Sequence, residues 1–330
     1  MENITVVTEL TLSGLDFPME HRIVLFLLTL LLYIIILFGN TTLIVAIIVD
    51  KKLHEPMYIF LCNLCINSLY GTVGFYPKFL LDLLTTHTIS YAGCMLQGFV
   101  IHSSVCAEFS ILALMAYDRY VAICQPLIYH VIMTKLKISA FLFLSWLIPL
   151  FCMFMNTATL LGSRLCGSHI QKVYCVNWMI VNIACSPPRG HTGVSYFNVL
   201  FFSALFVLII WSYGCLIRTC LTSTENQRKF MQTCLPHLIG LTNFTISTLL
   251  DLFYMRFGSL YISQHLNNFM AMEFLLVPPA VNPFVYGFRL TAIRRKFVNL
   301  VFITRRNAKC EPVNMQIKRE LSNGNINPGK

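Results

Sequence analysis

Residues 23–49 read IVLFLLTLLLYIIILFGNTTLIVAIIV, an apolar run that contains no charged residue. A helix that crosses a bilayer needs roughly 20 mostly apolar residues, because the hydrocarbon core is about 30 Å thick. Backbone polar groups find no water partners in lipid, so a single spanning segment must satisfy them internally as an α-helix. This run therefore predicts a membrane-spanning helix.

Six further runs of comparable length follow along the chain. They cover residues 57–84, 92–123, 136–161, 194–221, 230–254 and 260–288, and the last is the least hydrophobic. The whole chain of 330 residues is 56% hydrophobic and 12% charged, with a mean hydropathy of +0.68. A soluble domain carries about 25% charged residues. We therefore predict an all-α integral membrane protein, folded as a bundle of seven transmembrane helices.

The basic residues indicate the orientation of the bundle. If the N-terminus lies outside, 18 of the 24 Lys and Arg residues fall on the cytosolic side and the other 6 on the outer side. Cytoplasmic loops carry an excess of Lys and Arg, so we expect the N-terminus outside and the C-terminus inside. The triplet Asn3-Ile4-Thr5 then becomes an extracellular glycosylation acceptor at Asn3.

Three regions follow from this topology. Residues 1–22 form an extracellular segment, residues 23–288 the transmembrane domain, and residues 289–330 the cytoplasmic end. Residues 291–302 mix basic and apolar side chains, which predicts a short amphipathic helix on the inner membrane surface. The tail beyond residue 305 is polar and is expected to be disordered. The first 20 residues lack the pattern of a cleavable signal peptide, so the run 23–49 is expected to serve as a signal anchor.

Several function classes find little support. A net charge of +10 would favour nucleic acid in a soluble protein, but here the basic residues sit at the ends of spans. No phosphate loop, nucleophile elbow or zinc spacing is present, so we predict neither an enzyme nor a cofactor. A transporter or channel remains an alternative. It would predict solute flux without a G protein, and more mid-membrane carboxylates than Glu108.

Thirteen cysteines occur, and four of them are expected on the outer side: Cys94 at the start of the third span, and Cys166, Cys175 and Cys185 in the long connection after the fourth span. The outer side of a membrane is oxidising, so disulfides are expected there. Four cysteines allow three pairings, and the spacing does not choose among them.

The motifs at the span ends carry a family resemblance. Residues 115–124 read MAYDRYVAIC, a longer form of an Asp-Arg-Tyr motif. Others occur in order: Gly39-Asn40, PMYIFL at 56–61, Ser212-Tyr213, Lys229, Thr233-Cys234, His237-Leu238, and NPFVY at 282–286. Over about residues 20 to 300 the chain resembles the olfactory (odorant) receptors, which are rhodopsin-like (class A) G-protein-coupled receptors.

The resemblance implies a function and a location. It implies binding of a small-molecule odorant in the outer half of the bundle, and activation of a stimulatory heterotrimeric G protein, raising cAMP. It also implies a multi-pass protein of the plasma membrane, in the sensory cilia of olfactory neurons. The implied disulfides are Cys94–Cys175 and Cys166–Cys185. A receptor of the same fold for a hormone, peptide or metabolite outside olfaction stays open.

The inner end of the third span holds an adjacent acid and base, Asp118 and Arg119. The resemblance implies a latch, in which Asp118 holds Arg119 until activation frees it for the G protein. An anchor for the helix at the membrane boundary is the alternative. The remaining residues assigned to G-protein coupling and switching are Tyr120, Tyr213, Lys229, Asn282, Pro283 and Tyr286.

Glu108 lies in mid-membrane, where an ionisable side chain is costly and needs a partner. Asn40, Ser68 and Asn282 are the expected partners in a polar hub. In the family this hub can hold sodium, whereas a protonated Glu108 in a neutral network is the alternative. The second span here reads Asn67-Ser68 where the family has an acid. The sixth span also departs from the family, at Phe244-Thr245 and at Pro236.

Helical phase and family analogy together predict a mostly apolar ligand pocket. Its lining is expected to include His102, Val105, Cys106, Phe197, Asn198, Phe201, Thr248, Leu252 and Met272. Four outer basic residues, Arg164, Lys172, Arg189 and Arg256, have two readings. They either steer anionic ligands towards the pocket or lie in a solvated loop.

Overall fold

The structure of the chain is a computed structural model. It describes residues 9–13, 17–186, 188, 190–220, 224–257 and 264–289. The glycosylation residue Asn3, the expected amphipathic helix at 291–302 and the polar tail lie outside these residues.

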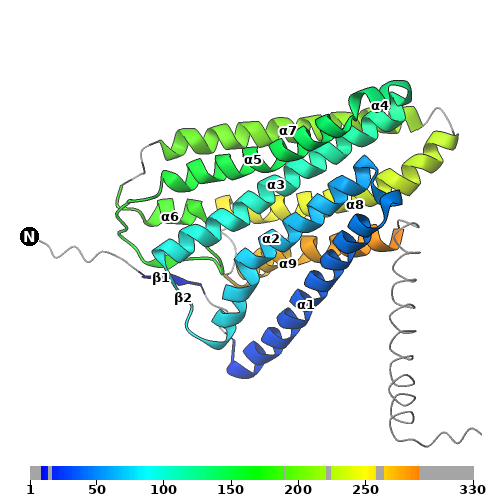
Figure 1. The fold of residues 1–330 in the computed structure, drawn as a ribbon. Coiled ribbons are helices and arrows are strands. Elements are labelled where there is room, and N and C mark those ends of the chain that lie inside the picture. The colour runs from blue at the N-terminus through cyan, green and yellow to red at the C-terminus, as the bar shows by residue number, and fades with distance from the viewer. Residues whose placement is uncertain are drawn as a thin grey trace, which may run out of the picture.

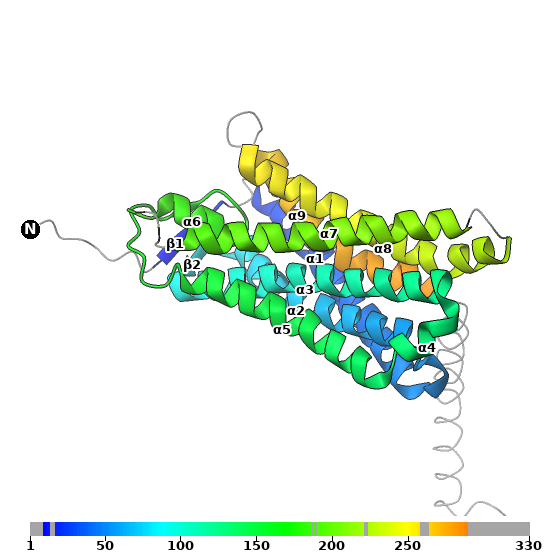
Figure 2. The same ribbon diagram turned by 90° about the horizontal axis from the view of Figure 1, so that it is seen from above.

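Long helices dominate the described part of the chain and run side by side along one bundle (Figures 1 and 2). Each predicted apolar run coincides with one of them. Their bounds are α1 (Met19–Val49), α2 (Pro56–Leu84), α3 (Tyr91–Cys124), α5 (Lys135–Ala158), α7 (His191–Cys220), α8 (Thr224–Phe257) and α9 (Gln264–Arg289). Within the described residues, α1, α2, α3, α5 and α7 are long and apolar enough to cross a membrane.

Local signals explain where several helices begin. Ser90 precedes α3 and its hydroxyl accepts a hydrogen bond from the Gly93 amide, while Thr134 does the same for the Lys137 amide at the start of α5. Such side chains satisfy the orphan donors of a helix N-terminus. Pro56 begins α2, where its missing N–H costs nothing. Short helices occupy the connections: η1 (Lys51–Leu53), η2 (Pro126–Ile128), α4 (Tyr129–Ile132) and α6 (Asn177–Ile183).

A small sheet closes one end of the bundle (Figure 1). Its strands are β1 (Glu9–Leu12), β2 (Thr88–Ser90) and β3 (His169–Ile170), in the order β2-β1-β3. β1 pairs antiparallel with β2 and parallel with β3. Leu10 and Leu12 are buried beneath it. None of these strands was predicted from the sequence.

Apolar side chains cover the exterior of the long helices as well as the interior. Leu28, Phe38, Leu200 and Trp211 are all more than half exposed. A water-soluble monomer rarely exposes a continuous apolar surface of this extent. The exterior is therefore suited to contact with lipid.

Candidate functional site

Two disulfides organise the end of the bundle that carries the sheet. Cys94 at the start of α3 is bonded to Cys175, with 5.3 Å between their Cα atoms. Cys166 is bonded to Cys185 within the same connection between α5 and α7, with a Cα separation of 4.8 Å. The pairing is the one that the family resemblance implies. The first disulfide fixes this connection, residues 159–190 and hereafter the outer loop, onto α3.

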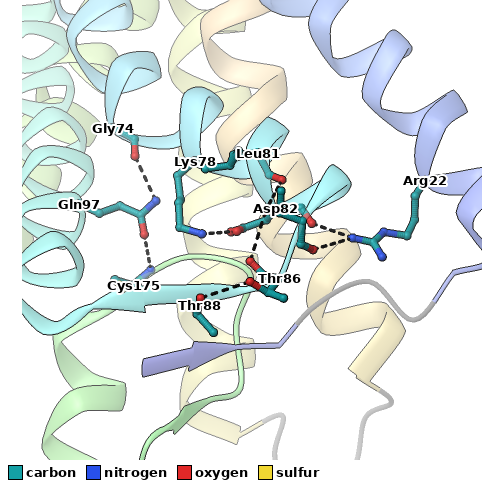
Figure 3. Close-up of polar contacts among 10 residues, drawn as sticks. Arg22, Gly74, Lys78, Leu81, Asp82, Thr86, Thr88, Gln97 and Cys175 are labelled. Carbon is teal, nitrogen blue, oxygen red and sulfur yellow. Dashed lines mark hydrogen bonds and ion pairs between the residues drawn. The ribbon is translucent and has the colours of Figure 1, made fainter. Parts of the chain in front are cut away.

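Polar contacts hold the outer loop and the outer helix ends in register (Figure 3). The Gln97 amide donates to the Gly74 carbonyl at 3.2 Å, and its oxygen accepts from the Cys175 amide at 3.0 Å. One side chain thus joins α2, α3 and the loop. Nearby, Lys78 forms an ion pair with Asp82, and Arg22 of α1 donates to the Asp82 carbonyl at 2.9 Å.

The segment after β3 inserts into the bundle. Val173, Tyr174 and Val176 are almost fully buried in an apolar cluster that also contains residues of α2, α3 and α9. The Tyr174 ring packs edge-on against Phe75, with 6.5 Å between the ring centroids. The loop therefore forms the outer boundary of the bundle interior.

Lys172 lies at the start of this inserted segment and is fully buried. Its Nζ forms an ion pair with Asp251 Oδ1 of α8 at 2.5 Å, and the Tyr174 hydroxyl donates to Asp251 Oδ2 at 2.9 Å. Burial lowers the pKa of the Lys172 ammonium, and the Asp251 carboxylate partly offsets that effect. Burial raises the pKa of the Tyr174 phenol, so its hydroxyl stays protonated and donates.

Both readings of the outer basic residues were wrong for Lys172. It is neither in solvent nor free to steer anions, because its charge is matched by a buried carboxylate that lies 79 residues further along the chain. Arg164 is exposed. Arg189 and the side chain of Arg256 lie outside the described part.

The residues predicted to line the pocket divide into two groups. His102, Val105, Cys106, Asn198, Thr248 and Met272 are buried or half-buried. Phe197 and Leu252, in contrast, are 59% and 52% exposed, on the exterior of α7 and α8. Phe201 lines a lateral groove of about 550 Å³ between α3, α5 and α7. Helical phase and family analogy did not predict the facing of Phe197 and Leu252, because neither contains information on how each helix is rotated in the bundle.

Asn198 is the most unusual of the buried group. It is 6% exposed, and neither its amide nitrogen nor its amide oxygen has a hydrogen-bond partner among the described residues. A buried polar group without a partner costs about 1–3 kcal/mol. The position therefore favours a polar partner from outside the chain.

The polar hub is only partly assembled around Glu108. Asn282 of α9 donates through Nδ2 to Glu108 Oε1 at 3.3 Å and to the Ser68 hydroxyl at 3.4 Å. Asn40 instead donates to the carbonyls of Ile36 and Pro279, at 2.9 and 3.3 Å. Asn282 therefore connects α2, α3 and α9, while Asn40 connects α1 to α9.

Asp118 and Arg119 form an ion pair near the opposite end of α3. Arg119 Nε lies 2.8 Å from Asp118 Oδ2, and Tyr129 of α4 donates its hydroxyl to Asp118 Oδ1 at 2.8 Å. Asp118 is fully buried and the Arg119 side chain is 13% exposed. Burial, with a smaller contribution from Asp118, raises the pKa of Tyr129, which therefore remains a donor. Tyr129 was not among the predicted residues.

The other predicted switch residues lie near this ion pair or along α9. Tyr213 of α7 hydrogen-bonds His237 of α8, and Tyr120 packs against Trp211 with ring centroids 5.3 Å apart. Pro283 packs against Gly39 of α1, where an added Cβ would lie 3.1 Å from the proline. The side chains of Lys229 and Tyr286 lie outside the described part.

Two further acidic residues escaped the sequence analysis, which counted Glu108 alone in mid-membrane. Asp251 is described above. Glu273 of α9 accepts a hydrogen bond from Ser247 of α8 at 2.7 Å. Both acids lie inside predicted spans, so their position in the runs 230–254 and 260–288 was the signal available for finding them.

Comparison with known proteins identifies the family. The olfactory receptor family model matches residues 29–304. Olfactory receptor 6E1 of Mus musculus is 33% identical over 303 residues, covering 90% of this chain and 96% of the relative. Olfactory receptor 11A1 of Homo sapiens is 35% identical over 288 residues, covering 86% and 90%. Olfactory receptor 13G1 of Homo sapiens is 35% identical over 292 residues, covering 87% and 94%. The chain therefore belongs to the olfactory receptor family, whose members are multi-pass plasma-membrane receptors that sense odorants through G proteins and are not enzymes.

Proposed function

We propose that all seven long helices cross the membrane, with the N-terminus and the sheet outside and the C-terminus inside. Residues 1–22 are then extracellular, residues 23–288 form the receptor domain and residues 289–330 are cytoplasmic. The distribution of Lys and Arg supports this orientation. So do the two disulfides, because disulfides persist on the oxidising side of a membrane.

The odorant binds in the outer half of the bundle, beneath the outer loop. The half-buried residues His102, Val105, Cys106, Thr248 and Met272 supply a mostly apolar lining, as in most small-molecule sites. The unsatisfied amide of Asn198 supports this position, since an odorant with a polar group would give it a partner.

The inner end activates a stimulatory G protein and so raises cAMP. The observation that carries this proposal is the ion pair that holds Arg119 on Asp118, whose other carboxylate oxygen accepts from the Tyr129 hydroxyl. Cys94 and Asp118 are 24 positions apart on one helix, which at 1.5 Å per residue is about 36 Å, close to the thickness of a bilayer. Arg is suited to an exchange of partners because its planar fork keeps its charge.

The polar hub and the termini complete the proposal. Glu108, Asn282 and Ser68 couple α2, α3 and α9, with a sodium ion or a proton on Glu108 balancing its charge. Asn3 carries a glycan, and the receptor resides in the sensory cilia of olfactory neurons.

The test records cAMP in cells that express an N-terminally tagged chain, over a panel of small odorants. Tag staining on unpermeabilised cells gives the surface level and reports the orientation. We expect an odorant-dependent rise that Arg119→Ala abolishes at matched surface level. Arg218→Ala, an exposed arginine in the last turn of α7, serves as the matched control and should keep the response. A response that survives Arg119→Ala would contradict the assigned role of the inner arginine.

A further inference from the structure

The outer ion pair has a hydrogen-bonding capacity that its internal contacts do not use. Lys172, Tyr174 and Asp251 form a cluster, hereafter the outer polar cluster, in which the lysine and the acid are 0% and 4% exposed at their side chains. Lys172 Nζ also lies 5.2 Å from the centroid of the Tyr174 ring. The two charged side chains are thus buried where the outer loop meets α8.

The outer polar cluster has more unused hydrogen-bond donors than unused acceptors. Asp251 uses one oxygen for Lys172 and the other for the Tyr174 hydroxyl. An ammonium has three N–H donors, and among the described residues only Asp251 accepts from that of Lys172. A buried ammonium with spare donors lacks acceptors, and a molecule with an acceptor oxygen would supply one.

The charge balance of the cluster restricts what that molecule can be. A carboxylate would have to share Lys172 with Asp251, placing two negative charges at one buried ammonium. An amine would compete with Lys172 for Asp251 and leave a buried ammonium unpaired. Removal of one partner from a buried ion pair is strongly destabilising, because it leaves an uncompensated buried charge. A neutral acceptor avoids both penalties because the ion pair stays intact.

The cluster lies beside the proposed odorant site. His102 of α3 lies within electrostatic range of both Lys172 and Asp251. Tyr174 belongs to the apolar cluster against which Val105 and Met272 pack. His102 and the apolar cluster that includes Tyr174 therefore connect the outer polar cluster to the proposed odorant site.

We propose that the outer polar cluster is the polar recognition element of the odorant site and selects uncharged molecules with an acceptor oxygen, such as ketones and esters, which bind the Lys172 ammonium. This inference rests on the outer position of the site in the proposed function. Because the charges of Lys172 and Asp251 already match each other, we expect the site to exclude charged ligands. Neutralising one partner should admit ligands of the opposite charge to the one that remains.

The experiment uses the full chain, purified in detergent, with probes matched in length. These are medium-chain methyl ketones and the carboxylate and primary amine of the same chain length. Binding is read from thermal stabilisation of the receptor, and G-protein activation is recorded separately in membranes. For the wild type we expect the ketone to bind at least about tenfold more tightly than either ion, the effect of about one good polar contact.

Variants of the ion pair should change which of the three probes binds most tightly. Asp251→Asn should favour the carboxylate by at least about tenfold over the ketone, because the Lys172 ammonium loses its matching negative charge while the shape is kept. Lys172→Met should weaken ketone binding and admit the amine. Asp82→Asn, in the other outer ion pair, is the matched control and should keep the wild-type order.

The outcomes separate this inference from the proposed function. The affinities of the wild-type receptor for the three probes are measured without any variant. If the wild type binds the carboxylate or the amine more tightly than the ketone, the inference is overturned even if the variants fail to fold. Binding by none of the probes, or an order that Asp251→Asn leaves unchanged, would also overturn it. Probe binding in the expected order without G-protein activation would contradict the proposed function and leave the inference standing.

Discussion

The outer ion pair Lys172–Asp251 and the inner ion pair Asp118–Arg119 are built differently. The outer pair joins two segments 79 residues apart and excludes solvent from both charges. The inner pair joins adjacent residues, and Arg119 keeps a partly exposed side chain. An ion pair between neighbours adds no connection between elements, so the chain can release it without coming apart. The outer pair connects the loop to α8, so its loss affects structure as well as recognition.

The largest expected effect comes from cutting the covalent tether that positions the outer pair. Cys94→Ser opens a disulfide of sequence separation 81, worth about 4.5 kcal/mol in the loop-entropy account. We expect surface staining to fall to background. Cys166→Ser removes the disulfide whose cysteines are 19 residues apart, and the loss in the free energy of unfolding should be smaller, about 3 kcal/mol. Cys215→Ser removes a free cysteine and is the control. Normal surface staining of Cys94→Ser would show that the outer loop holds its position without the tether.

Breaking the outer pair itself should have the next largest effect. Lys172→Met leaves the Asp251 carboxylate buried with Tyr174 as its remaining partner, at a cost of about 3 kcal/mol in the free energy of unfolding. Thermal denaturation of the purified receptor measures the loss. The double variant Lys172→Met, Asp251→Leu removes both charges and should regain most of it. If the double variant is as unstable as the sum of the two single variants, the charges are not coupled as the structure indicates.

A smaller loss should follow from the contact that seats the outer loop on α3. Gln97→Met removes the acceptor of the buried Cys175 amide and the donor to Gly74. An orphaned buried donor costs about 1–3 kcal/mol, so we expect about 2 kcal/mol by the same denaturation assay. Leu96→Met changes the preceding residue, which faces outward, and should be neutral. An equally neutral Gln97→Met would mean that the disulfide alone positions the loop.

The inner pair should respond in signalling more than in stability. Asp118→Asn weakens the hold on Arg119, and we expect basal cAMP at matched surface level to rise about fivefold, equivalent to about 1 kcal/mol. Tyr129→Phe removes one hydrogen bond to Asp118 and should give a smaller rise. Glu55→Gln changes an exposed acid next to the start of α2 and should leave basal cAMP unchanged. Unchanged basal cAMP in Asp118→Asn would assign the pair to anchoring.

The two ion pairs also show what the sequence could predict. The apolar runs located each long helix of the described residues, with the largest difference in a starting point at α8, which begins at residue 224 instead of 230. The family match confirmed the resemblance. The family could be predicted because its motifs are short stretches of sequence that occur in a fixed order. Asp118 and Arg119 are adjacent in the sequence, so their ion pair could be predicted from the sequence alone. Lys172 and Asp251 meet only through the fold, and nothing local marks either as paired.

Side-chain facing was the other point that the sequence left open. Phe197 and Leu252 fit the helical phase of a pocket, yet they lie on the exterior. A helix that is apolar all round, in a membrane, gives no amphipathic signal for its interior face. The strand β1 was missed for a related reason, since its four residues gain their partners from loops more than 70 residues away.

The sheet at the outer end also sets an order of assembly during synthesis. Its central strand, β1, is made first, whereas β2 follows after α2 and β3 only after α5. A ribosome-bound chain therefore carries an unpaired edge at residues 9–12 while four long helices enter the membrane. Unpaired strand edges are sites of mispairing and of chaperone capture. Closure of the sheet by His169–Ile170 marks the moment at which the nascent receptor stops presenting that edge to the quality-control machinery.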